Sequence, residues 1–183
     1  RLFWLLFFHK KSDKQENTNR TSAMKYIKTL NENDLHLSAS ILKAFVPGEI
    51  YDMHTHPYHP SHFPAGEWPF LEEAGILGCE EHRNALQRYM PATKIHGLYF
   101  GMPRKTADRD AMNAWVAKEV WQNGTELSCP LMVASPEDDP VQVAEQLRSG
   151  LFCGLKVYHC YASRPDTMNA SITEYAPEWM WEI

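Results

Sequence analysis

Short apolar runs alternate with amphipathic segments along most of this chain. In the segment 107–122, for example, Met112, Val116 and Val120 recur at helical spacing and line one face. Strands that alternate with helices in this way are typical of parallel βα units. The apolar runs predict strands over residues 49–56, 94–101, 127–134 and 151–158.

Helix boundaries are marked by capping residues and by breakers. Asn31 and Asn33 are possible caps for a short predicted helix over 33–45, which Pro47 and Gly48 end. Further helices are predicted over 79–90, over 107–122 behind a Thr106 cap, over 137–150 behind a Ser135 cap, and over 171–183 behind the capping box Ser171-Ile172-Thr173-Glu174.

The composition is that of a globular protein. Hydrophobic residues make up 44% of the chain and charged residues 22%. The net charge of -5 offers no basic surface, so no nucleic-acid partner is expected. The chain has four cysteines and no C-x-x-C pair: Cys79, Cys129, Cys153 and Cys160. This pattern predicts reduced thiols and a cytoplasmic location.

Residues 1–23 are interpreted as a non-native or disordered leader. The apolar run 2–8 is too short to cross a bilayer, which needs about 20 residues, so no membrane partner is expected. His9-Lys10-Lys11 follow at the point where a signal peptide needs small residues for cleavage. We therefore take Met24 as the start of a single domain over 24–183.

The first predicted strand ends in Asp52-Met53-His54-Thr55-His56. Side chains two residues apart share a face of a regular strand, so Asp52, His54 and His56 are expected on one side, with the imidazoles about 7 Å apart along the strand. At this spacing two neutral imidazoles are able to converge on one metal ion. The motif predicts His54 and His56 as metal ligands, while Asp52 either orients an imidazole or has a structural role.

The fourth predicted strand holds a lysine among apolar residues, in Gly154-Leu155-Lys156-Val157-Tyr158-His159. A buried ammonium group without a partner is costly, so Lys156 needs a partner, a lowered pKa or covalent chemistry. Alternation places Lys156 and Tyr158 on one face and His159 on the other. This favours Lys156 as a metal ligand and leaves His159 as a second candidate or a polar residue at the rim.

Two further histidines lie in the segment 57–78, which is rich in proline and glycine. A loop of this length inside a compact domain is more often functional than idle. His59 and His62 are therefore candidates for contact with a substrate, although solvated loop positions are the favoured interpretation.

The motif Asp52-Met53-His54-Thr55-His56 resembles the opening motif of the amidohydrolase superfamily, and Lys156-Val157-Tyr158 resembles the fourth-strand lysine motif of its dihydroorotase-type members. The last residues, 174–183, and the overall spacing look most like the amidohydrolase-related branch, which contains hydrolases and decarboxylases. The resemblance implies a TIM-type (β/α)8 barrel that holds one or two divalent metal ions, zinc foremost, at its C-terminal mouth. It further implies that Lys156 is carbamylated and bridges two metals.

The resemblance covers residues 45–183, and the chain of 183 residues is shorter than the roughly 250 of a complete barrel. The expected fold is therefore α/β, the first half of a (β/α)8 barrel, with about four βα units. The family's later metal histidines and its aspartate general base have no counterpart here. We expect a metal-dependent hydrolase of amide- or ester-type bonds in a small-molecule substrate, or a decarboxylase, that uses metal-activated water and has little or no activity as this half alone. The exposed edge of the fourth strand predicts self-association.

Two alternatives remain open. One is a phosphoesterase or nuclease barrel that also opens with His-x-His, although the run Gly154-Leu155-Lys156-Val157-Tyr158 fits it less well. The other is a non-catalytic, degenerate α/β module or an open flavodoxin-like sheet whose histidines are structural. His56-Pro57-Tyr58 provides no glycine loop to cradle a phosphate after the first strand, which weighs against the open sheet.

Overall fold

The computed structural model of the protein describes residues 30–183, so the predicted leader and its boundary at Met24 lie outside the described residues. Among the helices of residues 30–183, none is long and apolar enough to cross a membrane. The strands are β1 (Glu49–Thr55), β2 (Lys94–Tyr99), β3 (Cys129–Pro130), β4 (Met132–Val133) and β5 (Leu155–Lys156). The helices are α2 (Glu32–Leu37), α3 (Lys43–Phe45), α4 (Pro69–Ala74), α5 (Cys79–Gln87), α6 (Arg109–Asn123), α7 (Pro140–Arg148), α8 (Ile172–Tyr175) and α9 (Trp179–Glu182).

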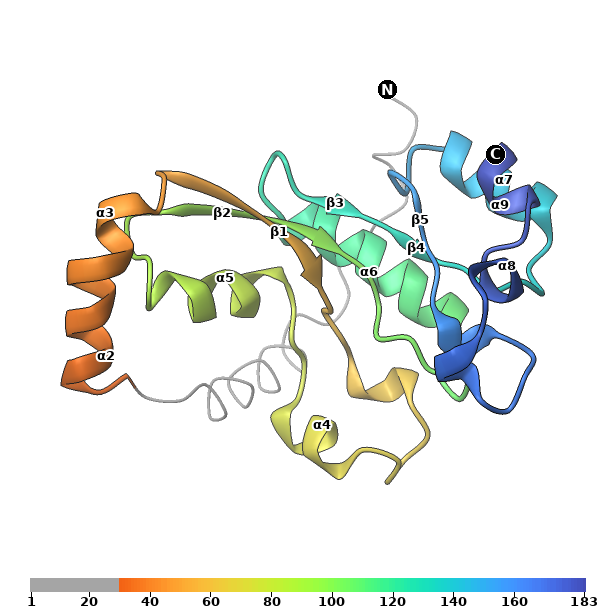
Figure 1. The fold of residues 1–183 in the computed structure, drawn as a ribbon, viewed down its shortest axis with the longest axis horizontal. Coiled ribbons are helices and arrows are strands. Elements are labelled where there is room, and N and C mark those ends of the chain that lie inside the picture. The colour runs from red at the N-terminus through yellow and green to blue at the C-terminus, as the bar shows by residue number, and fades with distance from the viewer. Residues whose placement is uncertain (1–29) are drawn as a thin grey trace.

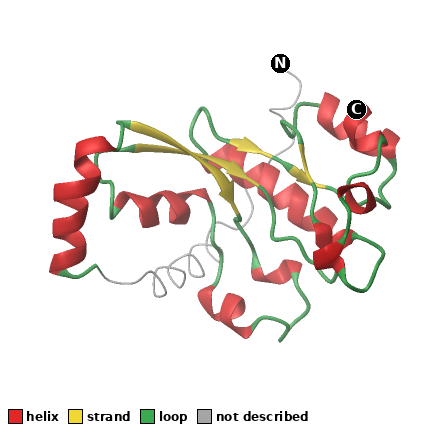
Figure 2. Cartoon of the chain, viewed as in Figure 1, coloured by secondary structure: helices red, strands yellow, loops and turns green. Residues whose placement is uncertain are grey.

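The strands are all parallel and follow one another in chain order. β1, β2 and β3 form one sheet, and β4 and β5 form another. Leu131 alone separates β3 from β4, so one extended segment serves both sheets: the Leu131 N–H donates to the Tyr99 carbonyl (2.8 Å), and the Met132 N–H donates to the Gly154 carbonyl (3.0 Å). The strands thus cross the middle of the molecule as a series (Figure 2). The fold is mixed α/β, and the strands of the described residues do not close into a barrel.

Helices α5 and α6 lie along the strands (Figure 1), and both contribute buried side chains to the core. The predicted apolar face of α6 is buried, with Met112 and Val116 at 0% exposure and Val120 at 3%. Val116 and Val120 pack with Cys79 of α5 and Tyr99 of β2. One part of the core therefore lies between one face of the strands and these two helices, as parallel βα units require.

The buried side chain of Asn113, on α6, completes the hydrogen bonding of a strand. Its Nδ2 donates to the Val133 carbonyl (2.9 Å), and its Oδ1 accepts from the Val133 N–H (2.9 Å). The neighbouring Met132 and Ala134 N–H groups donate to the other side, toward β5. Within the described part of the chain, Val133 has no β-strand partner on the β2 side, so the amide of Asn113 takes the place of one.

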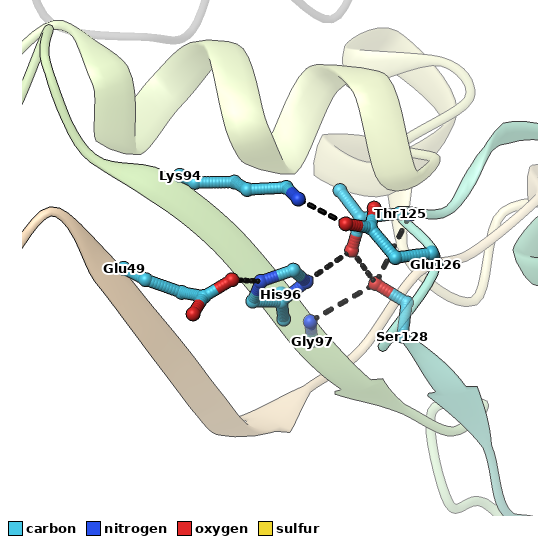
Figure 3. A network of polar contacts seen from close by, with 7 residues as sticks. All are labelled: Glu49, Lys94, His96, Gly97, Thr125, Glu126 and Ser128. Carbon is cyan, nitrogen blue, oxygen red and sulfur yellow. Dashed lines mark hydrogen bonds and ion pairs between the residues drawn. The ribbon is translucent and has the colours of Figure 1, made fainter.

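A polar network joins β1, β2 and the segment before β3 (Figure 3). His96 is fully buried, and its Nε2 lies 2.6 Å from Glu49 Oε1 while its Nδ1 lies 2.5 Å from Thr125 Oγ1. Ser128 Oγ accepts from the backbone N–H groups of Gly97 and Thr125, both at 3.2 Å. These bonds fix the start of β3 against β2 at the N-terminal end of the sheet.

The first predicted helix is present but not uniform. Asn31 and Asp34 form its capping box, and the chain then runs through α2, a π-helical turn over Ser38–Leu42, and α3. The segment 57–78, predicted as a loop, contains a 3-10 turn over Pro60–His62 and helix α4.

Two predicted caps are wrong. The cap of α6 is Asp108, whose carboxylate accepts from the Ala111 N–H (3.0 Å), while the Thr106 hydroxyl donates to Glu67. The cap of α7 is Asp139 instead of Ser135. In each case the predicted residue lies in the turn that precedes the helix.

The last two predicted elements are shorter than expected. The fourth strand spans only Leu155–Lys156, although the Cys153 N–H before it already donates to the Pro130 carbonyl (3.0 Å). After it, Tyr158 leads into a 3-10 turn over His159–Tyr161. The last helix begins behind Ser171 as predicted, but Pro177 divides it into α8 and α9.

Candidate functional site

An irregularity near the end of β1 sets the directions of its polar side chains. Asp52 pairs with Gly97 and Thr55 with Tyr99, so three steps along β1 match two along β2. One extra residue in a strand reverses the alternation beyond it. As a result Asp52 and Thr55 both face His82 of α5, at 3.0 Å and 3.5 Å from its Nε2. The prediction that Asp52 shares a face with His54 and His56 is therefore wrong.

The imidazoles of His54 and His56 converge. Their Nε2 atoms are 3.2 Å apart and their ring centroids 5.0 Å apart, closer than the spacing along a regular strand. Both rings meet the buried ring of Phe100 edge to face, at centroid distances of 5.0 Å and 4.7 Å. His54 is exposed and His56 half-buried, so the pair lies on an open face of the molecule.

The carbonyl of Gly101 fixes the tautomer of His56. This oxygen only accepts, so His56 Nδ1, 3.2 Å away, carries the proton and donates. In the neutral ring the Nε2 lone pair is then free to point toward His54. Burial lowers the pKa of His56, with the nearby charges of His54 and Lys156 acting in the same direction and the backbone at Gly101 and Phe100 opposing them. The neutral form that a metal ligand requires is thus favoured.

Tyr158 and Lys156 approach the same histidine pair from the end of β5. Tyr158 Oη lies 3.1 Å from the Nε2 atoms of both His54 and His56. The ammonium of Lys156 lies over the ring of Phe100 at 4.5 Å and near the ring of Tyr158 at 5.2 Å. The shared face predicted for Lys156 and Tyr158 thus points toward the histidines.

Burial perturbs both of these side chains. It lowers the pKa of Lys156, for which the described residues provide no carboxylate partner. It also raises the pKa of Tyr158 to about 12, with the neighbouring Cys160 acting in the same direction. In the protein alone Tyr158 is therefore a neutral phenol, and part of the usual preference of lysine for its charged form is lost.

Asp52 takes part in a separate chain of contacts. Its carboxylate accepts from the His54 backbone N–H (3.0 Å) and from His82 Nε2 (3.0 Å), and His82 Nδ1 lies 2.9 Å from Tyr99 Oη. Burial on its own raises the pKa of Asp52, but the hydrogen bonds from His54 and His82 outweigh burial and lower it. Asp52 therefore orients an imidazole, that of His82, and supports the backbone of His54.

The remaining candidate histidines lie elsewhere. His59 Nδ1 accepts from the Ser61 N–H (3.2 Å) at the start of a 3-10 turn. His62 is buried beside Trp115, and its Nδ1 has no hydrogen-bond partner among residues 30–183. His159 Nδ1 donates to the Thr167 carbonyl (3.1 Å) and so turns away from the histidine pair.

The donor set of the site fits a divalent metal in part. Among the described residues there is no group of three or more His, Cys, Asp or Glu side chains able to hold a metal ion. However, two nitrogen ligands of one tetrahedral zinc ion, at 2.0–2.1 Å each, lie about 3.3–3.4 Å apart. The separation of 3.2 Å between the two Nε2 atoms is close to that value.

Sequence reasoning missed four residues that shape this site. The spacing of Tyr158 from Lys156 predicts that both lie on the same face of the fourth strand, the face that contacts the histidines. An aromatic residue two positions after the lysine is the signal that could have identified it. Phe100 and Gly101 directly follow β2. Because β1 and β2 are parallel, these two residues lie at the same end of the sheet as His54. His82 lies on a helix, and nothing in its local pattern marked it.

No family model matches this chain, and neither does any curated protein or solved structure.

Proposed function

We propose that this chain is the metal-binding part of a hydrolase of the amidohydrolase type, in which His54 and His56 bind a divalent cation, zinc foremost. The proposal rests on one observation, the convergence of the two Nε2 atoms to 3.2 Å. The Gly101 carbonyl supports it, because it holds His56 as the tautomer whose Nε2 is free to bind a metal. The substrate class proposed is a small molecule with an amide- or ester-type bond, or a carboxylate that is lost as carbon dioxide.

The strand order supports the first half of a (β/α)8 barrel over an open sheet. In the described residues β2 lies beside β1, β3 beside β2 and β5 beside β4, all in parallel, while β4 continues the segment of β3. A flavodoxin-like sheet instead places its second strand at the edge and its first strand inside. The site also lies at the carboxyl ends of β1 and β5, where such barrels bind their ligands.

Lys156 is proposed as a carbamate that supplies a further ligand oxygen. The neutral amine attacks carbon dioxide, an N–C bond forms, and the amine loses a proton to solvent. The lowered pKa of Lys156 increases the fraction of neutral amine that is able to react. The Phe100 ring under the amine excludes water from one side.

A bound divalent cation supplies Lewis-acid chemistry, which acidifies water and polarises a carbonyl group. The side chains of the chain itself provide the rest. His54 and His56 orient their lone pairs, Phe100 supports both rings, and Asp52 holds the His54 backbone. The open face beside His54 leaves room for a substrate.

Self-association is proposed at the edge of β5. Of the described strands, β5 pairs only with β4, and an apolar cavity of about 310 Å³ lies beside it, lined by Leu155, Val157, Met180 and Trp181 among others. A cytoplasmic location is proposed on the free thiols of the four cysteines.

Metal binding by the full chain tests the proposed function. We expect zinc to bind, as measured by calorimetric titration and by the metal content after dialysis, and we expect His54→Ala and His56→Ala each to lower the affinity by about tenfold or more. His36→Ala, at an exposed histidine of α2, is the matched control and should bind zinc like the wild type. Equal zinc affinity in all four proteins would show that the pair is not a metal site and would favour a non-catalytic module.

Carbamylation and the reaction class need separate measurements. Bicarbonate labelled with carbon-13 should give a carbamate resonance in the wild type that is missing in Lys156→Met. The zinc-loaded protein should then be compared on amide, ester and phosphodiester substrates. Turnover of phosphodiesters alone would assign the site to the phosphoesterase class instead.

A further inference from the structure

The phenol oxygen of Tyr158 forms a nearly equilateral triangle with the two imidazole nitrogens. Its Oη lies 3.1 Å from His54 Nε2 and 3.1 Å from His56 Nε2, and the two nitrogens are 3.2 Å apart. The three atoms come from two different sheets, because His54 lies in β1 and His56 directly follows it, while Tyr158 follows β5. Three atoms able to donate electron pairs thus meet at one point.

Hydrogen bonds among these three atoms cannot use all three edges of the triangle. His56 Nε2 carries no proton, because the proton of that ring is on Nδ1 and donates to Gly101. Tyr158 can donate its one proton to His56, and His54 Nε2 can donate one proton to Tyr158. The remaining edge, between His54 and His56, then has no proton along it, although it is only 3.2 Å long. A cation beside the triangle, in contrast, uses one lone pair from each corner.

The backbone holds Tyr158 in this position. Tyr158 immediately precedes a 3-10 turn over His159–Tyr161, and its carbonyl accepts from the Tyr161 N–H (3.1 Å). Its ring lies 6.4 Å from the ring of Phe100, which also supports both histidines. The phenol is thus placed by the same aromatic side chain that places the imidazoles.

We propose that Tyr158 is a third metal ligand, so that His54, His56 and Tyr158 together bind one face of a divalent cation. This inference rests on the proposed function and adds to it a residue outside the expected ligand set. On binding, the phenol proton leaves to solvent and the oxygen binds as phenolate, which contributes one negative charge to a site otherwise made of neutral imidazoles. An N2O set of this kind is suited to zinc and to copper, which accept imidazole nitrogens readily.

Lys156 does not replace Tyr158 in this role. The lysine nitrogen lies over the Phe100 ring, and no hydrogen bond joins it to either imidazole among the described residues. A carbamate on Lys156 extends beyond the amine and needs carbon dioxide, whereas the phenol is already beside both nitrogens. Metal binding through Tyr158 is therefore expected without added bicarbonate.

Copper(II) and zinc titrations of the full chain test the role of Tyr158. Copper(II) bound to a phenolate absorbs visible light through charge transfer from oxygen to metal. We expect this band in the wild type, its loss in Tyr158→Phe, and its retention in Tyr175→Phe, a matched change at a half-buried tyrosine of α8. Zinc affinity should fall about 10- to 100-fold in Tyr158→Phe and stay unchanged in the control. Melting curves verify that both variants fold.

The outcomes separate this inference from the proposed function. If zinc binding depends on His54 and His56 but is the same in Tyr158→Phe, and the copper band persists there, Tyr158 is not a ligand and the proposed function stands. If the wild type binds neither metal, both proposals fail. Loss of the band with loss of affinity in Tyr158→Phe alone supports the third ligand.

Discussion

Replacing Asn113 by leucine should destabilise the protein strongly, although the two side chains have similar size. The amide of Asn113 makes two hydrogen bonds of 2.9 Å with the backbone of Val133, and the residue is only 3% exposed. Leucine fills the space but leaves the Val133 N–H and carbonyl buried without partners. Each unsatisfied group costs about 1–3 kcal/mol, so the free energy of unfolding should fall by about 2–6 kcal/mol.

Urea denaturation followed by tryptophan fluorescence measures this change. The midpoint should fall while the dependence of the free energy on urea stays constant, because the surface exposed on unfolding is unchanged. The melting temperature should fall by about 2–4 °C per kcal/mol. Gln122→Leu, at an exposed position of the same helix, is the control for adding leucine to α6. A free energy for Asn113→Leu within about 0.5 kcal/mol of the wild type would refute the assignment of Asn113 as a substitute strand partner.

Three further changes test other parts of the structure. Gly101→Ala places a Cβ 2.4 Å from Met112 Sδ, so the free energy of unfolding should fall by about 1–3 kcal/mol and zinc affinity should fall with it. An unchanged melting temperature and unchanged zinc binding would contradict the close approach. Ser128→Ala removes the acceptor for two backbone N–H groups and should cost about 1–3 kcal/mol in urea denaturation, whereas a neutral result would mean that water replaces the hydroxyl. Burial lowers the pKa of His62 to about 4, and the charge of nearby His59 acts in the same direction. The imidazole is therefore protonated at a higher pH in the unfolded chain than in the folded protein. The free energy of unfolding should then fall as the pH drops from about 6.5 to about 4. His62→Phe should remove up to about 3 kcal/mol of that loss, and an identical pH dependence of urea stability in variant and wild type would rule His62 out as its source.

The sequence pattern located most elements because their periodicity is local. The apolar positions of α6 and the runs at β1 and β2 are recognisable within a few residues. Where the prediction failed, the cause lies in distant partners. Thr106 and Asp108 are both suitable caps, but the Thr106 hydroxyl donates to Glu67, far away in the chain, and Asp108 caps the helix. Pro177 is the exception, because a proline within a predicted helix was itself a reason to end it.

The candidate site shows the same division. His54, His56 and Lys156 were recognisable because their residue types are unusual at the ends of apolar strands. The direction of the Asp52 side chain was not recognisable, because the extra residue in β1 is defined only by how β1 pairs with β2. The approach of Tyr158 to His54 joins residues 104 positions apart, and no local pattern encodes such a distance.

The break at Leu131 gives the protein two sheets that share one segment of chain. β4 and β5 are therefore able to separate from each other while the hydrogen bonds of β1, β2 and β3 stay intact, and amide hydrogen exchange should divide the strands into two cooperative units. His54 and His56 belong to the first unit and Tyr158 to the second. A ligand that binds across them ties the opening of one unit to that of the other. Hydrogen exchange at the β5 amides, which are remote from both histidines in sequence, then reports whether a ligand is bound at the end of β1.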